Sequence, residues 1–97
     1  MKSLTEVLEE LEQNGYDETF RAQESGLCAT KAGHVYPTGQ LHVDESIRIE
    51  NASDPDNQVL VLALHTTADP KLRGTYVVTY GTNMPPVDSA MLQQLDV

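Results

Sequence analysis

Four polar side chains at alternate positions, Asp44, Ser46, Arg48 and Glu50, form the strongest candidate ligand site in the sequence. Alternate residues of a β-strand point to the same face, so a strand here would place the Arg48 guanidinium between two carboxylates. Such a set can orient an anionic metabolite, and His65 adds an imidazole that can donate or accept a hydrogen bond. The competing interpretation is charge pairing across an open sheet. The candidate ligand-binding residues are therefore Asp44, Arg48, Glu50 and His65.

Catalytic motifs are missing from the sequence. It contains no G-x-S-x-G, G-x-x-x-x-G-K-[ST], G-x-G-x-x-G or H-E-x-x-H. His65 is expected near Tyr76 or Tyr80 of the following strand, where a His–Tyr pair could transfer a proton, and the alternative is that His65 is only the polar end of its strand. The sequence thus predicts no catalytic residues and favours a protein that is not an enzyme.

Three residues, Cys28, His34 and His42, are of the types that ligate soft metals. Their spacing matches no zinc pattern, a fourth ligand is missing and no CxxC pair accompanies them. A buried thiol and two surface imidazoles are the simpler interpretation. We therefore expect no metal and no cofactor.

Acidic side chains dominate the composition, with six Lys and Arg against fifteen Asp and Glu and a formal net charge of −9. A broad nucleic-acid interface needs clustered Lys and Arg, so neither nucleic acid nor an anionic membrane is an expected partner. Two explanations of the acidic excess stay open. One is solubility, and the other is a high-salt cytoplasm that screens the repulsion between the charges.

The length of 97 residues suits a single domain, 1–97. Cys28 is the one cysteine, so the chain can form no internal disulfide and suits a reducing compartment. Residues 1–6 lack the apolar segment of a signal peptide, and no apolar run approaches the roughly 20 residues that span a bilayer. A cytoplasmic location is expected.

An amphipathic helix is predicted over residues 3–14. Ser3 followed by Glu6 is a capping box, and Gly15 stands where a left-handed residue ends a helix. The apolar residues repeat at i, i+3, i+4 and i+7, as one helix face requires: Leu4, Val7, Leu8 and Leu11.

The remaining elements are mostly strands. They are expected at 19–23, 27–31, 42–50, 58–67 and 75–80, with a loop at 32–40 and a Pro turn at 54–57. In the third strand Val43, Ile47 and Ile49 should share one side. Asp88 is expected to cap a short last helix. The predicted fold class is α+β: an N-terminal helix, an antiparallel meander of four or five strands, and a short C-terminal helix.

The apolar run from Val59 to Leu64 predicts a central strand buried on both faces. Two helices can cover one face of the sheet, which leaves the other to the loop at 34–40 or to a partner. We therefore expect a homodimer or protein interface through Val59, Val61 and Ala63.

The block Val43-Asp44-Glu45, Arg48, Glu50 and Ser53-Asp54-Pro55-Asp56, followed by an apolar strand and Tyr80-Gly81, resembles a family of small bacterial proteins of about this length. Its members are often labelled phosphoribosylpyrophosphate synthetase. The chain is too short for the two-domain fold of that enzyme and lacks a glycine-rich phosphoribosyl-binding loop. The resemblance therefore implies a family without an established activity, and it draws attention to Asp44, Glu45, Arg48 and Glu50.

Two functions compete on this sequence. The first is a small cytoplasmic, non-catalytic binding or interaction module, which the two-sided apolar strand favours. The second is a small enzyme or ligand-binding domain that holds an anionic metabolite with Arg48 and the neighbouring acids.

Overall fold

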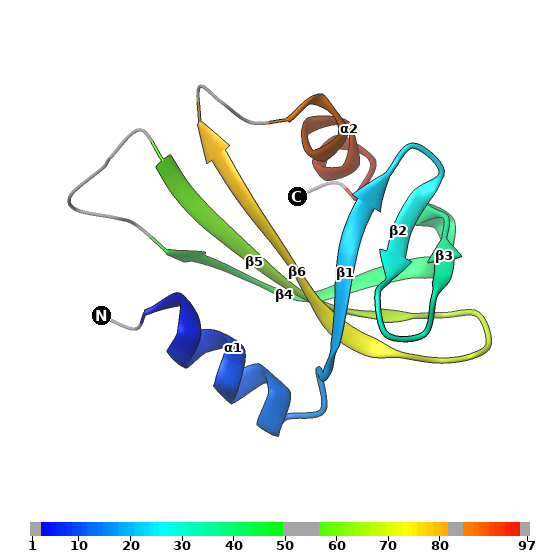
Figure 1. The fold of residues 1–97 in the computed structure, drawn as a ribbon, viewed down its shortest axis with the longest axis horizontal. Helices are drawn as coiled ribbons and strands as arrows, with labels where there is room; N and C mark the ends of the chain where they lie inside the picture. The colour runs from blue at the N-terminus through cyan, green and yellow to red at the C-terminus, as the bar shows by residue number, and fades with distance from the viewer. Residues whose placement is uncertain (1–2, 50–56, 82–84, 96–97) are drawn as a thin grey trace.

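A computed structural model describes residues 3–49, 57–81 and 85–95. The candidate residue Glu50 and most of the predicted turn at 54–57 lie outside these ranges. The elements in chain order are α1 (Leu4–Gln13), β1 (Glu18–Gln23), β2 (Gly26–Ala29), β3 (His34–Tyr36), a 3₁₀ turn (Thr38–Gln40), β4 (Leu41–Ile49), β5 (Asn57–Thr66), β6 (Arg73–Gly81) and α2 (Pro86–Leu95) (Figure 1).

Helix α1 confirms the predicted helix. The Ser3 hydroxyl accepts a hydrogen bond from the Glu6 N–H at 3.3 Å and caps the first turn. At the other end Gly15 adopts a left-handed φ of 98°, and the Tyr16 N–H bonds back to the Leu11 carbonyl at 2.9 Å. This is a Schellman ending, which turns the chain sharply and directs Tyr16 toward the sheet.

The six strands form one sheet in the order β3-β2-β1-β6-β5-β4. Strands β1 and β6 run parallel, whereas the other neighbours are antiparallel. The predicted antiparallel meander of four or five strands is therefore wrong in both strand number and direction. Two three-stranded meanders are joined at the β1–β6 seam. Gly74 makes the seam possible, because a Cβ there would lie 2.3 Å from the Glu18 carbonyl oxygen.

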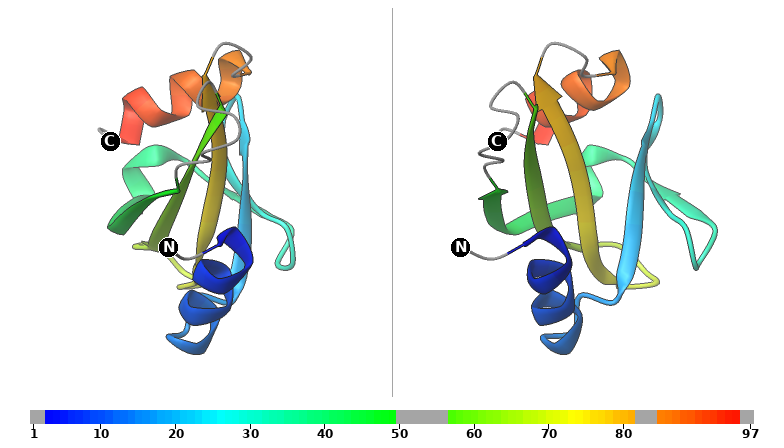
Figure 2. Two further views of the ribbon diagram at one scale, coloured as in Figure 1. Left: turned by 90° about the vertical axis from the view of Figure 1, so that its left-hand side faces the viewer. Right: turned by 60° about the vertical axis from the view of Figure 1, so that its left-hand side comes forward.

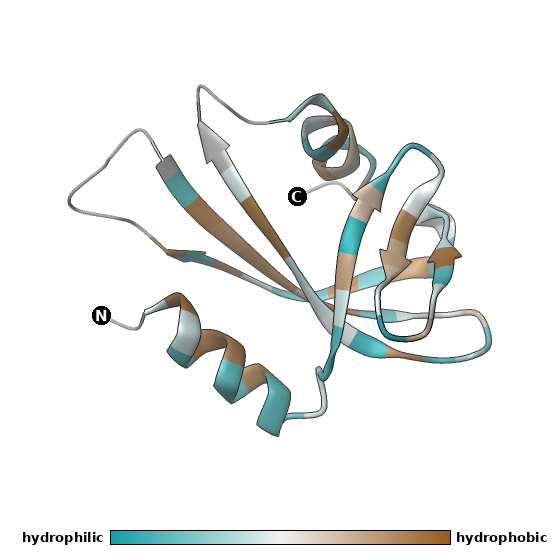
Figure 3. Cartoon of the chain, viewed as in Figure 1, coloured by the Kyte–Doolittle hydropathy of each residue, from teal (hydrophilic) through white to brown (hydrophobic). Residues whose placement is uncertain are grey.

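The helices cover opposite faces of the sheet. Met91 of α2 packs in one core cluster with Leu62 and Leu64 of β5, whereas Val7 and Leu11 of α1 pack with Val61 and Ala63 in a second cluster. Alternate residues of β5 therefore face different helices, in keeping with the unbroken apolar band along this strand (Figure 3). The helices lie apart in all views (Figures 1 and 2). The expectation of two helices on one face and an open second face is wrong, since α1 covers that face.

A β-bulge divides β4. Val43 pairs with Leu64 and Glu45 pairs with Ala63, so Asp44 is an extra residue opposite β5. One extra residue moves every later side chain to the other face. Val43 accordingly packs in the α2 cluster, whereas Ile47 and Ile49 pack in the α1 cluster. The prediction that Val43, Ile47 and Ile49 share one side is wrong for this reason.

Buried hydrogen bonds stabilise the ends of the sheet. The buried Glu18 carboxylate accepts hydrogen bonds from the N–H groups of Thr19, Lys31 and Ala32 at 2.8, 3.0 and 3.1 Å. The Tyr36 hydroxyl donates to the Pro70 carbonyl at 2.5 Å, which holds β3 against the β5–β6 connection. The loop expected at 32–40 thus contains a short strand, and Tyr36 is buried.

Helix α2 begins at Pro86, so Asp88 lies in its first turn. The Asp88 carboxylate accepts a hydrogen bond from the hydroxyl of buried Tyr76 on β6. Burial, together with this bond, raises the pKa of the Tyr76 hydroxyl. Asp88 therefore joins the helix to the sheet. Among the described residues no helix is long and apolar enough to cross a membrane.

Candidate functional site

Four side chains, Tyr16, His42, Asp44 and His65, meet beside the C-terminal end of α1, and we call them the Asp44 cluster. One carboxylate oxygen of Asp44, Oδ2, accepts hydrogen bonds from the Tyr16 hydroxyl and from His65 Nδ1, each at 2.9 Å. The second oxygen, Oδ1, lies 3.8 Å from His42 Nε2. The imidazole ring centres of His42 and His65 are 5.1 Å apart. One carboxylate thus touches a phenol and faces two imidazoles.

The local backbone structure explains why the side chains of the Asp44 cluster lie close together. His42 and His65 occupy directly opposed positions on the antiparallel strands β4 and β5, and opposed side chains share a face. The bulge at Asp44 aims its carboxylate at the same region instead of continuing the alternation of β4. Tyr16 arrives from the turn that ends α1 and packs with the α1 core cluster.

Arg73 extends the cluster across a third strand. It lies directly opposite His65 in the β5–β6 register, so His42, His65 and Arg73 form a row over β4, β5 and β6. The Arg73 side chain also reaches toward α1, because a Cβ built on Gly15 would lie 3.8 Å from Arg73 Nη1. The row therefore borders the end of the helix.

The hydrogen bonds shift two ionisation equilibria. The bond to Asp44, followed by burial, raises the pKa of the Tyr16 hydroxyl. Partial burial alone would raise the pKa of the Asp44 carboxyl, but the bonds from His65 and Tyr16, with the charges of His65 and His42, hold it below its usual range. At neutral pH Tyr16 is consequently a hydrogen-bond donor and Asp44 an ionised acceptor.

This arrangement assigns a role to each ring nitrogen of His65. An ionised carboxylate only accepts hydrogen bonds, so the Nδ1 atom that contacts Asp44 carries the proton. In the neutral imidazole, Nε2 is then the unprotonated acceptor on the far side of the ring. The His65 side chain is 36% exposed and that of His42 is 64% exposed, so ligands can reach both rings. The cluster offers an oriented proton acceptor but no activated nucleophile.

The structure unites two of the four predicted ligand-binding residues and separates a third. Asp44 and His65 are in contact. Arg48 pairs with Leu60 of the α2 cluster and so lies on the opposite face of the sheet, because the bulge comes between Asp44 and Arg48. Glu50 is outside the described residues. The predicted polar row of one face is therefore wrong for Asp44 and Arg48.

The expected neighbour of His65 is also different. Tyr76 lies on the α2 face and bonds to Asp88, so the predicted pair of His65 with Tyr76 does not form. The Tyr80 side chain is outside the described residues. The aromatic partner of the cluster is Tyr16, to which His65 is linked through Asp44.

Sequence reasoning missed Tyr16, His42 and Arg73 as members of the site. A hairpin register drawn for 42–50 and 58–67 would have placed His42 opposite His65, since both stand at the outer ends of strands joined by one turn. Continuing the register to the next strand would have added Arg73. Nothing local signals Tyr16, which lies 28 residues from Asp44.

The residues considered for a metal do not come together. Cys28 is on β2 and His34 on β3, whereas His42 is on β4 at the other edge of the sheet. His34 instead packs edge-on against Tyr36, with ring centres 4.7 Å apart. Over residues 3–49, 57–81 and 85–95 no three His, Cys, Asp or Glu side chains form a ready-made metal site.

The predicted interface residues lie under α1. Val61 and Ala63 are completely buried and Val59 is partly buried against the same cluster. They stabilise the packing of α1 on the sheet, and Val61 and Ala63 present no surface to a second chain in this fold.

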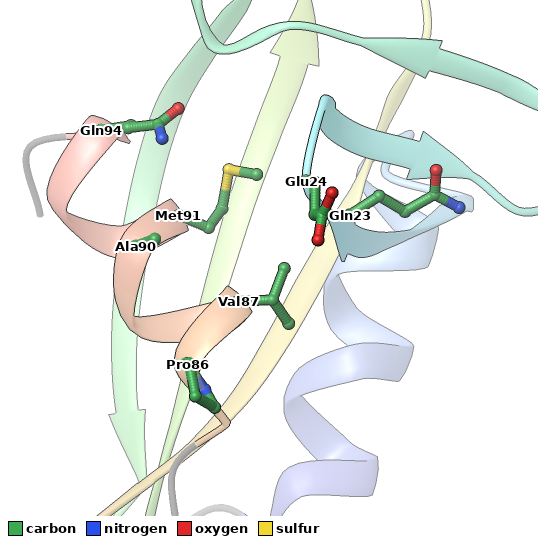
Figure 4. A pocket seen from close by; sticks show the side chains of 7 residues that line it. All are labelled: Gln23, Glu24, Pro86, Val87, Ala90, Met91 and Gln94. Carbon is green, nitrogen blue, oxygen red and sulfur yellow. The ribbon is translucent and has the colours of Figure 1, made fainter.

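A separate pocket of about 300 Å³ lies between α2 and the end of β1 (Figure 4). Val87 points from the helix toward Gln23 and Glu24, and Met91 lines the floor. The seven lining residues provide apolar surface, amides and one carboxylate, but no cation and no group that titrates near neutral pH. The Asp44 cluster is thus the better-equipped site chemically.

Comparison of the chain with family models, curated proteins and solved structures finds no match.

Proposed function

We propose that this protein is a small, non-catalytic binding module that holds an anionic metabolite against His42, His65 and Arg73. The observation that carries the proposal is the row of these three residues in register across β4, β5 and β6. Basic side chains are scarce in this chain, with six Lys and Arg and three His, yet three of them adjoin here.

Asp44 supports such a site although it is an anion. Its Oδ2 atom is already hydrogen-bonded by Tyr16 and His65, so its charge is largely satisfied within the cluster. The carboxylate also fixes the orientation of the His65 ring, and a pre-oriented group loses less conformational entropy when a ligand binds. Asp44 is therefore a positioning residue for His65.

Two of the three ligand-facing residues, Arg73 and His65, indicate the chemical class of the ligand. The Arg73 guanidinium donates to an anionic oxygen, whereas the unprotonated Nε2 of His65 accepts from a hydroxyl or an acidic proton. Hydroxy acids and singly ionised phosphate esters carry both features. Because no activated nucleophile accompanies the two imidazoles among the residues that the structure describes, binding without turnover is the function supported best.

The resemblance to the small bacterial family is compatible with this site, since Asp44 belongs to the shared block. We propose family membership and a cytoplasmic location on the sequence features alone. The competing interaction-module function relied on an open apolar face, which α1 covers.

Binding of inorganic phosphate, a phosphate monoester and a short hydroxy acid tests the proposal. Two-dimensional NMR in EDTA should show saturable shifts at His65 and Arg73 with at least one of these probes. Arg73→Ala should weaken that binding at least about tenfold, since it removes a charge-assisted hydrogen bond of roughly 1.5–3 kcal/mol. Arg48→Ala is the matched control on the opposite face and should change nothing. Absence of binding to all three, or loss with Arg48→Ala alone, would refute the proposed site.

A further inference from the structure

Two imidazoles at opposed positions of neighbouring strands have the spacing of a metal chelate. Zinc–nitrogen bonds of about 2.0–2.1 Å in a tetrahedral site place two coordinating imidazole rings with their centres about 5 Å apart. The ring centres of His42 and His65 are 5.1 Å apart. His42 Nε2 now faces Asp44 Oδ1 at 3.8 Å, so the His42 ring must turn before both imidazoles can share one divalent ion. It has room to turn, because its side chain is 64% exposed.

Asp44 supplies the support that a metal-ligating histidine ordinarily has. Such histidines donate their second ring N–H to a carboxylate or carbonyl, which fixes the ring and makes the ligating nitrogen more basic. The contact of 2.9 Å between His65 Nδ1 and Asp44 Oδ2 has this form and leaves Nε2 for the ion. Tyr16 in turn holds the Asp44 carboxylate.

The surroundings favour a cation. The cluster borders the C-terminal end of α1, where the helix dipole is negative. The carboxylates of Asp44 and Glu45 raise the pKa of the Tyr16 hydroxyl, whereas the Arg73 guanidinium lowers it, so two negative charges and one positive charge surround the cluster. The protein as a whole carries a formal net charge of −9, which attracts dissolved cations.

We propose that His42 and His65 chelate one divalent transition-metal ion, with Asp44 as the positioning residue for His65. The site is open and not a closed structural one, because only two protein ligands hold the ion and water fills the other positions. The inference rests on the proposed function in one respect: with the ion bound, His65 Nε2 is a metal ligand and no longer accepts from the metabolite. The anionic metabolite would then take one of the open positions on the ion while its second oxygen contacts Arg73. The ion would add its positive charge to that of Arg73.

Calorimetric titration with Ni²⁺ alone, in a Cys28→Ser background that removes the thiol, tests the chelate. We expect one ion per chain, binding at least about tenfold more weakly to His42→Ala and to His65→Ala. His34→Ala is the matched control and should bind as the parent does. Asp44→Asn should weaken binding by about ten- to a hundredfold, the usual effect of losing a carboxylate behind a ligating histidine. His42 is exposed, so its alanine variant should fold normally and circular dichroism verifies this.

The parent protein failing to bind Ni²⁺, or His34→Ala weakening binding as much as His42→Ala, would overturn the chelate. Phosphate titrations with EDTA and with Ni²⁺ separate this inference from the proposed function. Phosphate binding that is equal in both conditions would retain the anion site and refute the metal. Ni²⁺ binding through the histidines without any anion binding would retain the chelate and refute the proposed function.

Discussion

Asp44 connects three parts of the chain through one carboxylate. Its side chain is 27% exposed, and its bonds to Tyr16 and His65 span 28 and 21 residues of sequence. Hydrogen bonds to a charged group contribute more than neutral ones, and they depend on each other when they share an acceptor. The Asp44 side chain thus stabilises the fold and also positions the His65 ring.

Asp44→Asn and Tyr16→Phe should each lower the free energy of unfolding by about 1 kcal/mol, since Tyr16→Phe removes the donor and Asp44→Asn replaces the charged acceptor with a weaker neutral one. The double variant should lose less than the sum, with a coupling of about 0.5–1 kcal/mol. Urea unfolding monitored by circular dichroism measures all three variants. Glu45→Gln is the control because it neutralises the neighbouring carboxylate. Additive losses, or an equal loss in Glu45→Gln, would contradict the Tyr16–Asp44 contact.

At the scale of elements, the β1–β6 seam depends on a missing side chain. A Cβ at Gly74 would lie 2.3 Å from the Glu18 carbonyl oxygen and 2.7 Å from the Phe20 ring. Gly74→Ala should therefore destabilise the fold by at least about 1–3 kcal/mol through overpacking. Gly39→Ala is the matched control, because nothing lies within 4 Å of its Cβ, and we expect a change within about 0.5 kcal/mol. Thermal unfolding compares the two. Equal stabilities would mean that β1 and β6 are not paired in this register.

The hydrogen bond between Tyr76 of β6 and Asp88 of α2 predicts that the stability of the fold decreases at alkaline pH. The pKa of Tyr76 is raised in the folded state by burial and by the bond to Asp88, so its contribution to stability is complete below the unfolded-state pKa near 10. As pH rises above about 10, the unfolded state releases this proton first and the contribution declines. The stability difference between the parent and Tyr76→Phe should therefore be about 1 kcal/mol at pH 8 and shrink by pH 11. Urea titrations at both pH values measure it, and a constant difference would argue against a buried, neutral Tyr76.

At the scale of the whole molecule, the sheet separates two hydrophobic cores, and one helix covers each core. Phe20, Leu62 and Tyr76 are buried on the α2 face, whereas Val61 and Ala63 are buried under α1. This arrangement buries both apolar faces of β5 within a single chain. A homodimer formed for that purpose is unnecessary.

Leu11→Ala tests the cover that α1 provides. Leu11 is only 4% exposed and contacts the second core, so its truncation should lower the free energy of unfolding by about 2–4 kcal/mol. Glu9→Ala on the exposed side of the same helix is the control and should stay within about 0.5 kcal/mol. Urea unfolding measures both variants. A small effect of Leu11→Ala would show that α1 does not pack on the Val61 face in solution.

Patterns with a short period were sufficient to predict most elements. The residues around Leu4, Val7 and Leu11 follow helical spacing, and Ser3 and Gly15 end the helix as expected. The strands at 42–50, 58–67 and 75–80 were placed within two residues of their observed bounds. The short strand at His34–Tyr36 was not predicted, because three residues are too few to establish an alternation.

The sequence by itself determined where helices and strands form, because those choices depend on side chains within a few positions of each other. Tertiary structure alone decided the parallel seam, the bulge at Asp44 and the side of the sheet that each helix covers. Each of these depends on backbone or side-chain contacts between distant segments, such as Glu18 with Gly74 and Tyr16 with Asp44. The candidate site follows the same division. Asp44 and His65 stand out by residue type and position, whereas Tyr16 and Arg73 join them only because the chain ends α1 beside a bulged strand.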